Sequence, residues 1–149
     1  MKKLFLLALT LLLIACATPV HNDFEGQRRK WQEADIAHYR FELNLICFCP
    51  FRHRMPLRIE VLNGQVVMMK DKSGHAVTAM DSDYRYFSRY ATFDRLFSEL
   101  RSNLSGKAYK VAAAYHSSYG FPTRITIDRI KGAADDELSL TVSAFERLP

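Results

Sequence analysis

An alternation of apolar and polar side chains over His38–Cys49 constrains the fold of this chain more than any other feature. Its apolar members are Tyr39, Phe41, Leu43 and Leu45, and its polar members are His38, Arg40, Glu42 and Asn44. A period of two places one set on the buried face of a β-strand and the other on the solvated face. The pattern therefore predicts a half-buried strand, and its continuation places Cys47 and Cys49 on the apolar face.

A β-hairpin is predicted around Asn63-Gly64, which separates the apolar segments Leu57–Leu62 and Gln65–Lys70. Asn-Gly is a preferred two-residue hairpin turn because both of its residues adopt positive φ. The register set by this turn gives two apolar cross-strand pairs, Val61 with Val66 and Ile59 with Met68.

The remaining elements define the fold class. Helices are expected at Asp23–Ala37, capped by Asn22 or Asp23, and at Phe93–Asn103, capped by Thr92. Strands are expected at Tyr109–Tyr115, Arg124–Ile130 and Leu138–Phe145. Residues 71–91 are expected to form loop or irregular structure. The resulting order is α-β-β-β-α-β-β-β, and its short connections favour antiparallel pairing. We expect an α+β domain with an antiparallel sheet of about six strands and two helices packed on one face.

The N-terminal segment has the organisation of a bacterial lipoprotein signal peptide. Met1-Lys2-Lys3 precedes the apolar run Leu4–Ala15, which is shorter than the roughly 20 residues that span a bilayer. The run ends in Leu13-Ile14-Ala15-Cys16, which resembles a lipobox with cleavage after Ala15 and lipidation of Cys16. An ordinary signal peptide with an incidental cysteine is the alternative. The predicted organisation is a signal peptide at 1–15, the lipidated Cys16 and a tether at 16–22, and a single domain at 23–149.

Lipidation of Cys16 would anchor the chain in a bilayer through two or three acyl chains, because each buried CH₂ contributes about 0.8 kcal/mol. Ala17, rather than Asp, follows the cysteine and indicates the outer membrane of a Gram-negative host, facing the periplasm. Loss of Lys2 and Lys3 leaves 19 of the 21 Lys and Arg residues against 16 Asp and Glu, so the formal net charge falls from +5 to +3. An exported chain of such mild charge is not expected to bind nucleic acid, and an envelope protein or a glycan is the expected partner.

Cys47 and Cys49 form the first candidate site. If Cys16 carries lipid, this even pair of thiols remains in an oxidising compartment. Alternate residues of a strand have Cα atoms about 6.5 Å apart, at the upper end of the disulfide range. Three interpretations remain open, namely a structural disulfide, a reduced buried pair, and a redox-active or metal-binding pair. The absence of a Cys-x-x-Cys spacing and of a zinc-type Cys/His set weakens the third.

Two further segments are candidates for binding. Asp128 and the run Asp135, Asp136 and Glu137 are a possible ligand or metal loop, with Asp128 approaching the run across a hairpin. Adjacent carboxylates point in different directions, so a solvated loop or a salt bridge to an arginine is the alternative. The segment Tyr84–Tyr90 interleaves aromatic residues with arginines and either stacks on sugars or peptide or packs against the sheet.

The sequence contains no His-Glu-x-x-His, Gly-x-Ser-x-Gly, Walker or Ser-x-x-Lys motif. We therefore assign no catalytic residue and no cofactor, and an enzyme is the less favoured class. A hydrolase that uses Asp128, Asp135, Asp136 and Glu137 is a distant third interpretation. The favoured function is a membrane-anchored, non-enzymatic binding or envelope-maintenance module. A thiol-redox protein that uses Cys47 and Cys49 is the alternative.

The chain resembles a bacterial lipoprotein family known as domain of unknown function 6174, over roughly residues 30–146. The resemblance is carried by a Tyr-x-Phe strand leading to Cys47-Phe48-Cys49-Pro50, by Asn63-Gly64, by Gly120–Asp128 and by Asp135-Asp136-Glu137. Phe121 departs from the family pattern, which more often has Tyr. His116-Ser117 also departs, because an Asp common in the family is missing and one carboxylate is lost from any metal site. The resemblance implies a location and a fold, but no activity.

Overall fold

The computed structural model describes residues 23–149, so the predicted signal peptide, the tether and Cys16 lie outside the described residues. The α-helices and strands of this part are α1 (Phe24–Glu33), β1 (His38–Ile46), β2 (Leu57–Leu62), β3 (Gln65–Lys70), α2 (Tyr84–Phe87), α3 (Phe93–Ser102), β4 (Lys110–Tyr115), β5 (Pro122–Asp128) and β6 (Leu138–Arg147).

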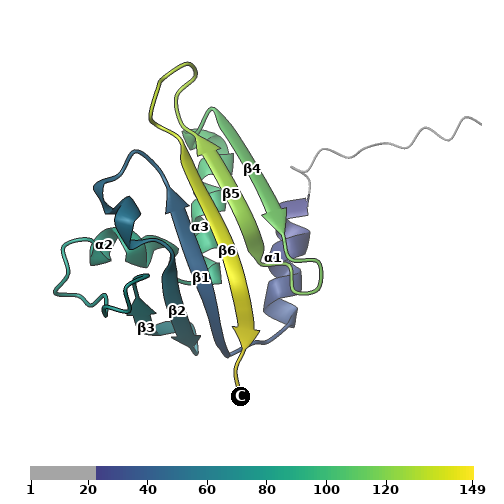
Figure 1. The fold of residues 1–149 in the computed structure, drawn as a ribbon. Coiled ribbons are helices and arrows are strands. Elements are labelled where there is room, and N and C mark those ends of the chain that lie inside the picture. Colours follow the sequence, from purple (N-terminus) through teal and green to yellow (C-terminus); the bar gives the residue numbers. More distant parts are fainter. Residues whose placement is uncertain (1–22) are drawn as a thin grey trace, which may run out of the picture.

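The six strands form one antiparallel sheet in the order β3-β2-β1-β6-β5-β4. The N-terminal strand β1 pairs with the C-terminal strand β6 at the centre of this sheet. Helices α1 and α3 lie behind the sheet in Figure 1, so the domain has two layers. The predicted α+β class and the antiparallel sheet are confirmed.

The hairpin between β2 and β3 has the predicted turn but only part of the predicted register. Asn63 and Gly64 have φ values of 50° and 75°, and Val61 faces Val66 as expected. Ile59 faces Met69 instead of Met68. The prediction failed by one residue because β3 contains a bulge, which inserts an unpaired residue and shifts every later pair.

The expectation of two helices was wrong, because the described chain contains the additional short helix α2. A four-residue helix is too short to show a helical period, so the sequence pattern of residues 71–91 predicts loop or irregular structure instead. Phe87 and Tyr90 from this region are buried, so its aromatic residues pack in the core. Helix α1 is also shorter than expected, ending at Glu33, because Asp35 adopts a left-handed φ of 46° that ends the helix.

Helix α3 presents the apolar stripe that the sequence predicted, with Phe93, Leu96, Phe97 and Leu100 all buried. Thr92 caps this helix, since its Oγ1 accepts a hydrogen bond from the Arg95 N–H at 3.2 Å. The Phe93 N–H donates to the Tyr39 hydroxyl at 3.3 Å. This second bond ties the first turn of α3 to the central strand β1.

The Phe93 ring lies at the centre of the aromatic core. Its centroid is 4.2 Å from Phe121, 4.8 Å from Tyr39 and 4.9 Å from Trp31. These four residues come from α3, β1, α1 and the residue just before β5. One side chain therefore joins both large helices to the sheet.

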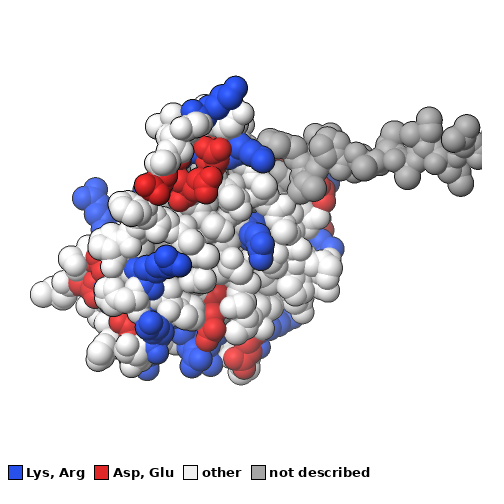
Figure 2. Space-filling model, turned by 45° about the horizontal axis from the view of Figure 1, so that its top comes forward, with Lys and Arg blue, Asp and Glu red and all other residues white. Residues whose placement is uncertain are grey.

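The sheet face opposite the helices is polar and is covered by no helix of residues 23–149 (Figure 1). We call it the open face. On β1 and β2 its charges are paired across strands, and Arg40 binds Glu60 at 2.7 Å. Hydrogen bonds from Arg40 and His38 hold the pKa of Glu60 below its ordinary value. Figure 2 shows charges of both signs dispersed among uncharged residues.

Substitution of Phe93 by Ala is expected to lower the free energy of unfolding by about 3–5 kcal/mol, because it opens a cavity among four elements. Phe48→Ala is the matched control, since Phe48 is 83% exposed, and it should change stability by less than about 0.5 kcal/mol. Urea unfolding followed by circular dichroism measures both. Equal effects of the two substitutions would contradict the placement of Phe93.

Candidate functional site

The candidate site lies at the end of the sheet where β1 terminates. β1 ends at Ile46, three residues before the predicted end, and Cys47 and Cys49 form a disulfide. The chain turns here, with the Cys49 N–H donating to the Cys47 carbonyl at 2.9 Å. Their Cα atoms are consequently 5.2 Å apart, closer than the roughly 6.5 Å of a regular strand.

Both sulfurs contact α2. Each Sγ lies 3.9 Å from the Tyr86 hydroxyl, and both cysteines are half-buried against the edge of the core. Phe48, between them, is exposed to solvent. The disulfide thus closes a tight turn that packs its sulfurs inward and projects a phenyl ring outward.

A short 3₁₀ helix, η2 (Pro50–Arg54), continues from the disulfide and is held against α2. Its buried residue Phe51 packs on Tyr86 and Phe87, with ring centroids 4.7 Å and 4.8 Å apart. The disulfide and Arg54 therefore lie at the two ends of one segment that is docked on the same helix.

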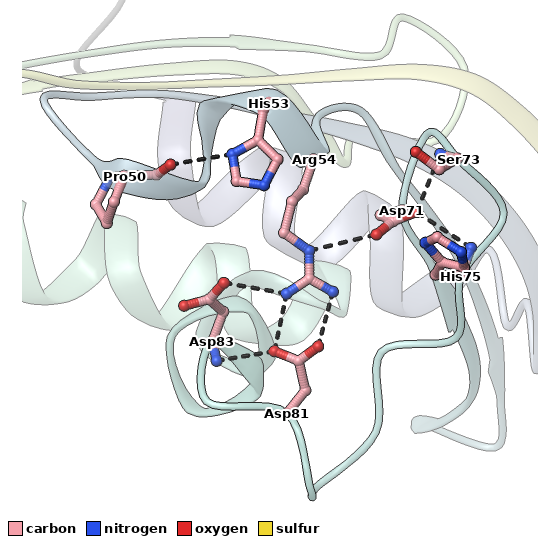
Figure 3. Close-up of polar contacts among 8 residues, drawn as sticks. All are labelled: Pro50, His53, Arg54, Asp71, Ser73, His75, Asp81 and Asp83. Atoms are coloured by element: carbon pink, nitrogen blue, oxygen red, sulfur yellow. Dashed lines mark hydrogen bonds and ion pairs between the residues drawn. The ribbon is translucent and has the colours of Figure 1, made fainter.

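Arg54 is the centre of a buried ionic network, shown in Figure 3. Its guanidinium binds both carboxylate oxygens of Asp81 at 2.8 Å, Asp83 at 3.0 Å and Asp71 at 3.3 Å. The Arg54 side chain is only 13% exposed and that of Asp71 only 7%. Fork-shaped, charge-assisted bonds of this kind are stronger than neutral ones.

Backbone groups complete the network. The Asp71 carboxylate accepts from the N–H groups of Ser73 and His75 at 3.0 Å and 3.1 Å, and that of Asp81 accepts from the Asp83 N–H at 2.9 Å. Burial opposes ionisation of Asp71, but these two N–H groups and Arg54 together hold its pKa below the ordinary value. The hydrogen bond from Arg54 likewise lowers the pKa of Asp81.

The network lines a surface hollow of about 510 Å³, with His53 and His75 also at its wall. Within residues 23–149, no group of three or more His, Cys, Asp or Glu side chains is arranged to hold a metal ion. The carboxylates of Asp71, Asp81 and Asp83 are instead directed at one guanidinium. The arrangement fastens the loop that follows β3 onto the segment that precedes β2.

Within residues 23–149, the predicted ligand or metal loop is not part of any group of three or more His, Cys, Asp or Glu side chains placed to hold a metal ion. Asp135, Asp136 and Glu137 lie in the loop between β5 and β6, where Figure 2 shows acidic side chains gathered. The Asp136 carboxylate accepts from the Ile130 N–H at 2.6 Å, and Asp135 adopts a left-handed φ of 67°. The Asp136 contact and the Asp135 conformation therefore shape the backbone of this loop.

Sequence reasoning missed the Arg54 network. Its members come from η2, the end of β3 and the loop before α2, and they are separated by up to 29 positions. Two signals were available in the sequence, namely the Asp81-Ser82-Asp83 spacing and the arginine at position 54. Neither marks a partner, because a charge pair between distant segments leaves no periodic pattern.

The chain belongs to a class of small two-layer α+β domains whose antiparallel sheet is covered by helices on one face. It is a member of the family of unknown function DUF6174, which matches residues 23–147. Neither a curated protein nor a solved structure matches the chain. In the part of the chain that the structure describes, no helix is both long and apolar enough to cross a membrane.

Substitution of Arg54 by Gln is expected to lower the free energy of unfolding by about 3 kcal/mol at pH 7, because it leaves carboxylates unpaired in a partly buried site. The pKa values of Asp71 and Asp81 lie below their ordinary 3.8 in the folded chain. Their stabilisation is therefore present above about pH 4 and is lost as the pH falls further. The deficit of the variant should shrink along the same range.

Urea unfolding between pH 3 and 7 tests this expectation. Arg58→Gln is the matched control, since Arg58 binds Glu42 at 3.1 Å while remaining 61% exposed. This control should lose less than about 1 kcal/mol. A deficit in the Arg54 variant that does not change with pH would contradict the electrostatic role of the network.

Proposed function

We propose that the protein is a non-enzymatic binding module of the cell envelope, anchored to the outer membrane through acylated Cys16. The observation that carries this proposal is the open face, which is a preformed polar surface of the sheet. The described helices all lie on the opposite face. The lipobox-like sequence before Cys16 supports the anchor.

The middle of the open face carries side chains suited to recognition by hydrogen bonding. Asn44, Thr141 and Arg124 form one row across β1, β6 and β5. The next row contains Ser139 and Thr126. Amides, hydroxyls and a guanidinium offer both donors and acceptors, and the mostly short side chains keep the surface flat. Such a surface supports binding of an envelope protein or a glycan.

Capture of envelope components tests this function. The full chain is cross-linked in intact cells and recovered from detergent-solubilised envelopes. Ser143→Arg places a long cation on the open face opposite Glu42 and is expected to reduce recovery of a specific partner at least tenfold. The expected cause is steric, because the long arginine side chain projects from the flat open face and keeps the partner away from it.

Ser98→Arg is the matched control, since Ser98 is exposed on α3, on the helical side of the domain. It should leave recovery unchanged. Cys16→Ser should shift the protein out of the membrane fraction without removing the binding surface. Recovery of no partner above background by the parent chain would count against a binding module.

A thiol-redox function is the second candidate, and the half-exposed disulfide favours it. In this function a partner dithiol would reduce the Cys47–Cys49 bond, receiving the disulfide while two electrons and two protons pass to this chain. Exposed Phe48 would provide apolar contact for that partner.

The redox state in cells tests this second candidate. Acid quenching, alkylation and mass spectrometry measure the thiol and disulfide fractions of Cys47 and Cys49. A redox protein is expected to show a mixture that shifts after an oxidant pulse. Complete oxidation that resists mild reductant, together with full function of a Cys47→Ser/Cys49→Ser variant, would identify a structural disulfide.

A further inference from the structure

The two edge strands of the sheet, β3 and β4, differ in how far other parts of the chain cover them. The β3 edge is partly covered by its own loop, since Ala76 bridges to Lys70 and the Val77 N–H donates to the Met69 carbonyl at 2.9 Å. The β4 edge has no strand neighbour on its outer side within residues 23–149. An open edge presents unpaired backbone groups that can template another strand.

The hydrogen-bond pattern identifies which backbone groups of β4 face outward. The Tyr109 N–H donates to the Arg129 carbonyl at 3.2 Å, in register with the β4–β5 ladder. Hydrogen-bonded pairs alternate along an antiparallel ladder, so Val111 and Ala113 bond inward to β5. The N–H and C=O groups of Lys110, Ala112 and Ala114 therefore point away from the sheet.

The side chains of β4 leave this edge accessible. Residues 111–114 are Val-Ala-Ala-Ala, without charge or proline, and Ala112 and Ala114 are exposed. Edge strands are commonly protected by such charges, prolines or bulges, and here the bulge falls only at the end of β4, between Ala114 and Tyr115. Tyr109, just before the strand, is 55% exposed.

Two cationic side chains beside the edge favour an acidic occupant. Lys110 and Arg124 lie on the open face, and neither forms an ion pair among the described residues, although Asp128 is the β5 partner of Lys110. Arg124 is opposite Ala114, whose methyl group leaves the guanidinium free to reach over β4. A second copy paired edge to edge would bring like charges together, whereas an acidic strand would be attracted.

We propose that β4 binds an extended acidic segment of a partner protein by antiparallel strand addition, which names the partner class of the proposed binding function and rests on it. Residues opposite Lys110 and Ala114 project on the open face and are acidic, meeting Lys110 and Arg124. The residue opposite Ala112 is small. The two residues between them face the helical side and are apolar, so the core motif is acidic–apolar–small–apolar–acidic.

The test uses the full chain in detergent and two fluorescent pentapeptides with blocked ends. The acidic probe is Glu-Val-Thr-Val-Glu and the basic probe is Lys-Val-Thr-Val-Lys, compared by fluorescence anisotropy. The acidic probe is expected to bind at least tenfold more tightly, and its affinity should fall as salt is raised from 50 to 500 mM because exposed charges become screened.

A charge reversal makes the test specific to this edge. Lys110→Glu/Arg124→Glu should invert the preference so that the basic probe binds more tightly. The matched control, Arg52→Glu/Lys72→Glu, changes the net charge equally at exposed positions before β2 and after β3 and should keep the acidic preference. Ala112→Pro removes one outward N–H without removing a β4–β5 bond and should weaken both probes.

Three results with the purified chain would overturn this proposal. They are a charge reversal that leaves the preference unchanged, loss of the preference in the control, and a concentration-dependent dimer in light scattering that Ala112→Pro abolishes. The last would assign the edge to a second copy of the chain. Capture of an envelope partner that depends on Ser143 and not on β4 would leave the binding function standing while removing this assignment.

Discussion

The packing of Phe93 against Trp31, Tyr39 and Phe121 is the interaction on which the rest of the domain depends. The stacked Phe93 and Phe121 rings are 4.2 Å apart, and the Phe93 N–H is bonded to the Tyr39 hydroxyl. Helix α3 is thereby fixed in position and orientation on β1, and α1 is fixed through Trp31. Because aromatic side chains bury large areas with defined geometry, a single cluster is sufficient to hold both large helices on the same face.

Placing both helices on one face has a direct consequence for function. The other face remains solvated, and its polar residues are free of structural duty beyond cross-strand pairs such as Arg40 with Glu60. Among residues 23–149, the β4 edge of the sheet also has no strand neighbour. The proposed binding surface and the proposed strand-addition edge are therefore adjacent parts of one layer, and Arg124 lies within reach of both.

The end of the sheet near β2 and β3 is stabilised by a different kind of interaction. The ionic network of Arg54 fastens the loop after β3 to the segment before β2, and the disulfide between Cys47 and Cys49 closes the turn after β1. The pKa values of Asp71 and Asp81 stay low because backbone N–H groups and a guanidinium replace part of the water that these carboxylates lose. The network thereby fixes the conformation of the loop that follows β3.

The sequence by itself determined the strands, the helix at Phe93, the Asn63-Gly64 hairpin and the α+β class, because periodicity and turn chemistry are local properties of the chain. Tertiary structure alone decided the bulge that shifts Met69, the short helix α2 and the Arg54 network. It also decided which face stays open. These features depend on contacts between segments far apart in the chain, for which a single sequence carries no periodic signal.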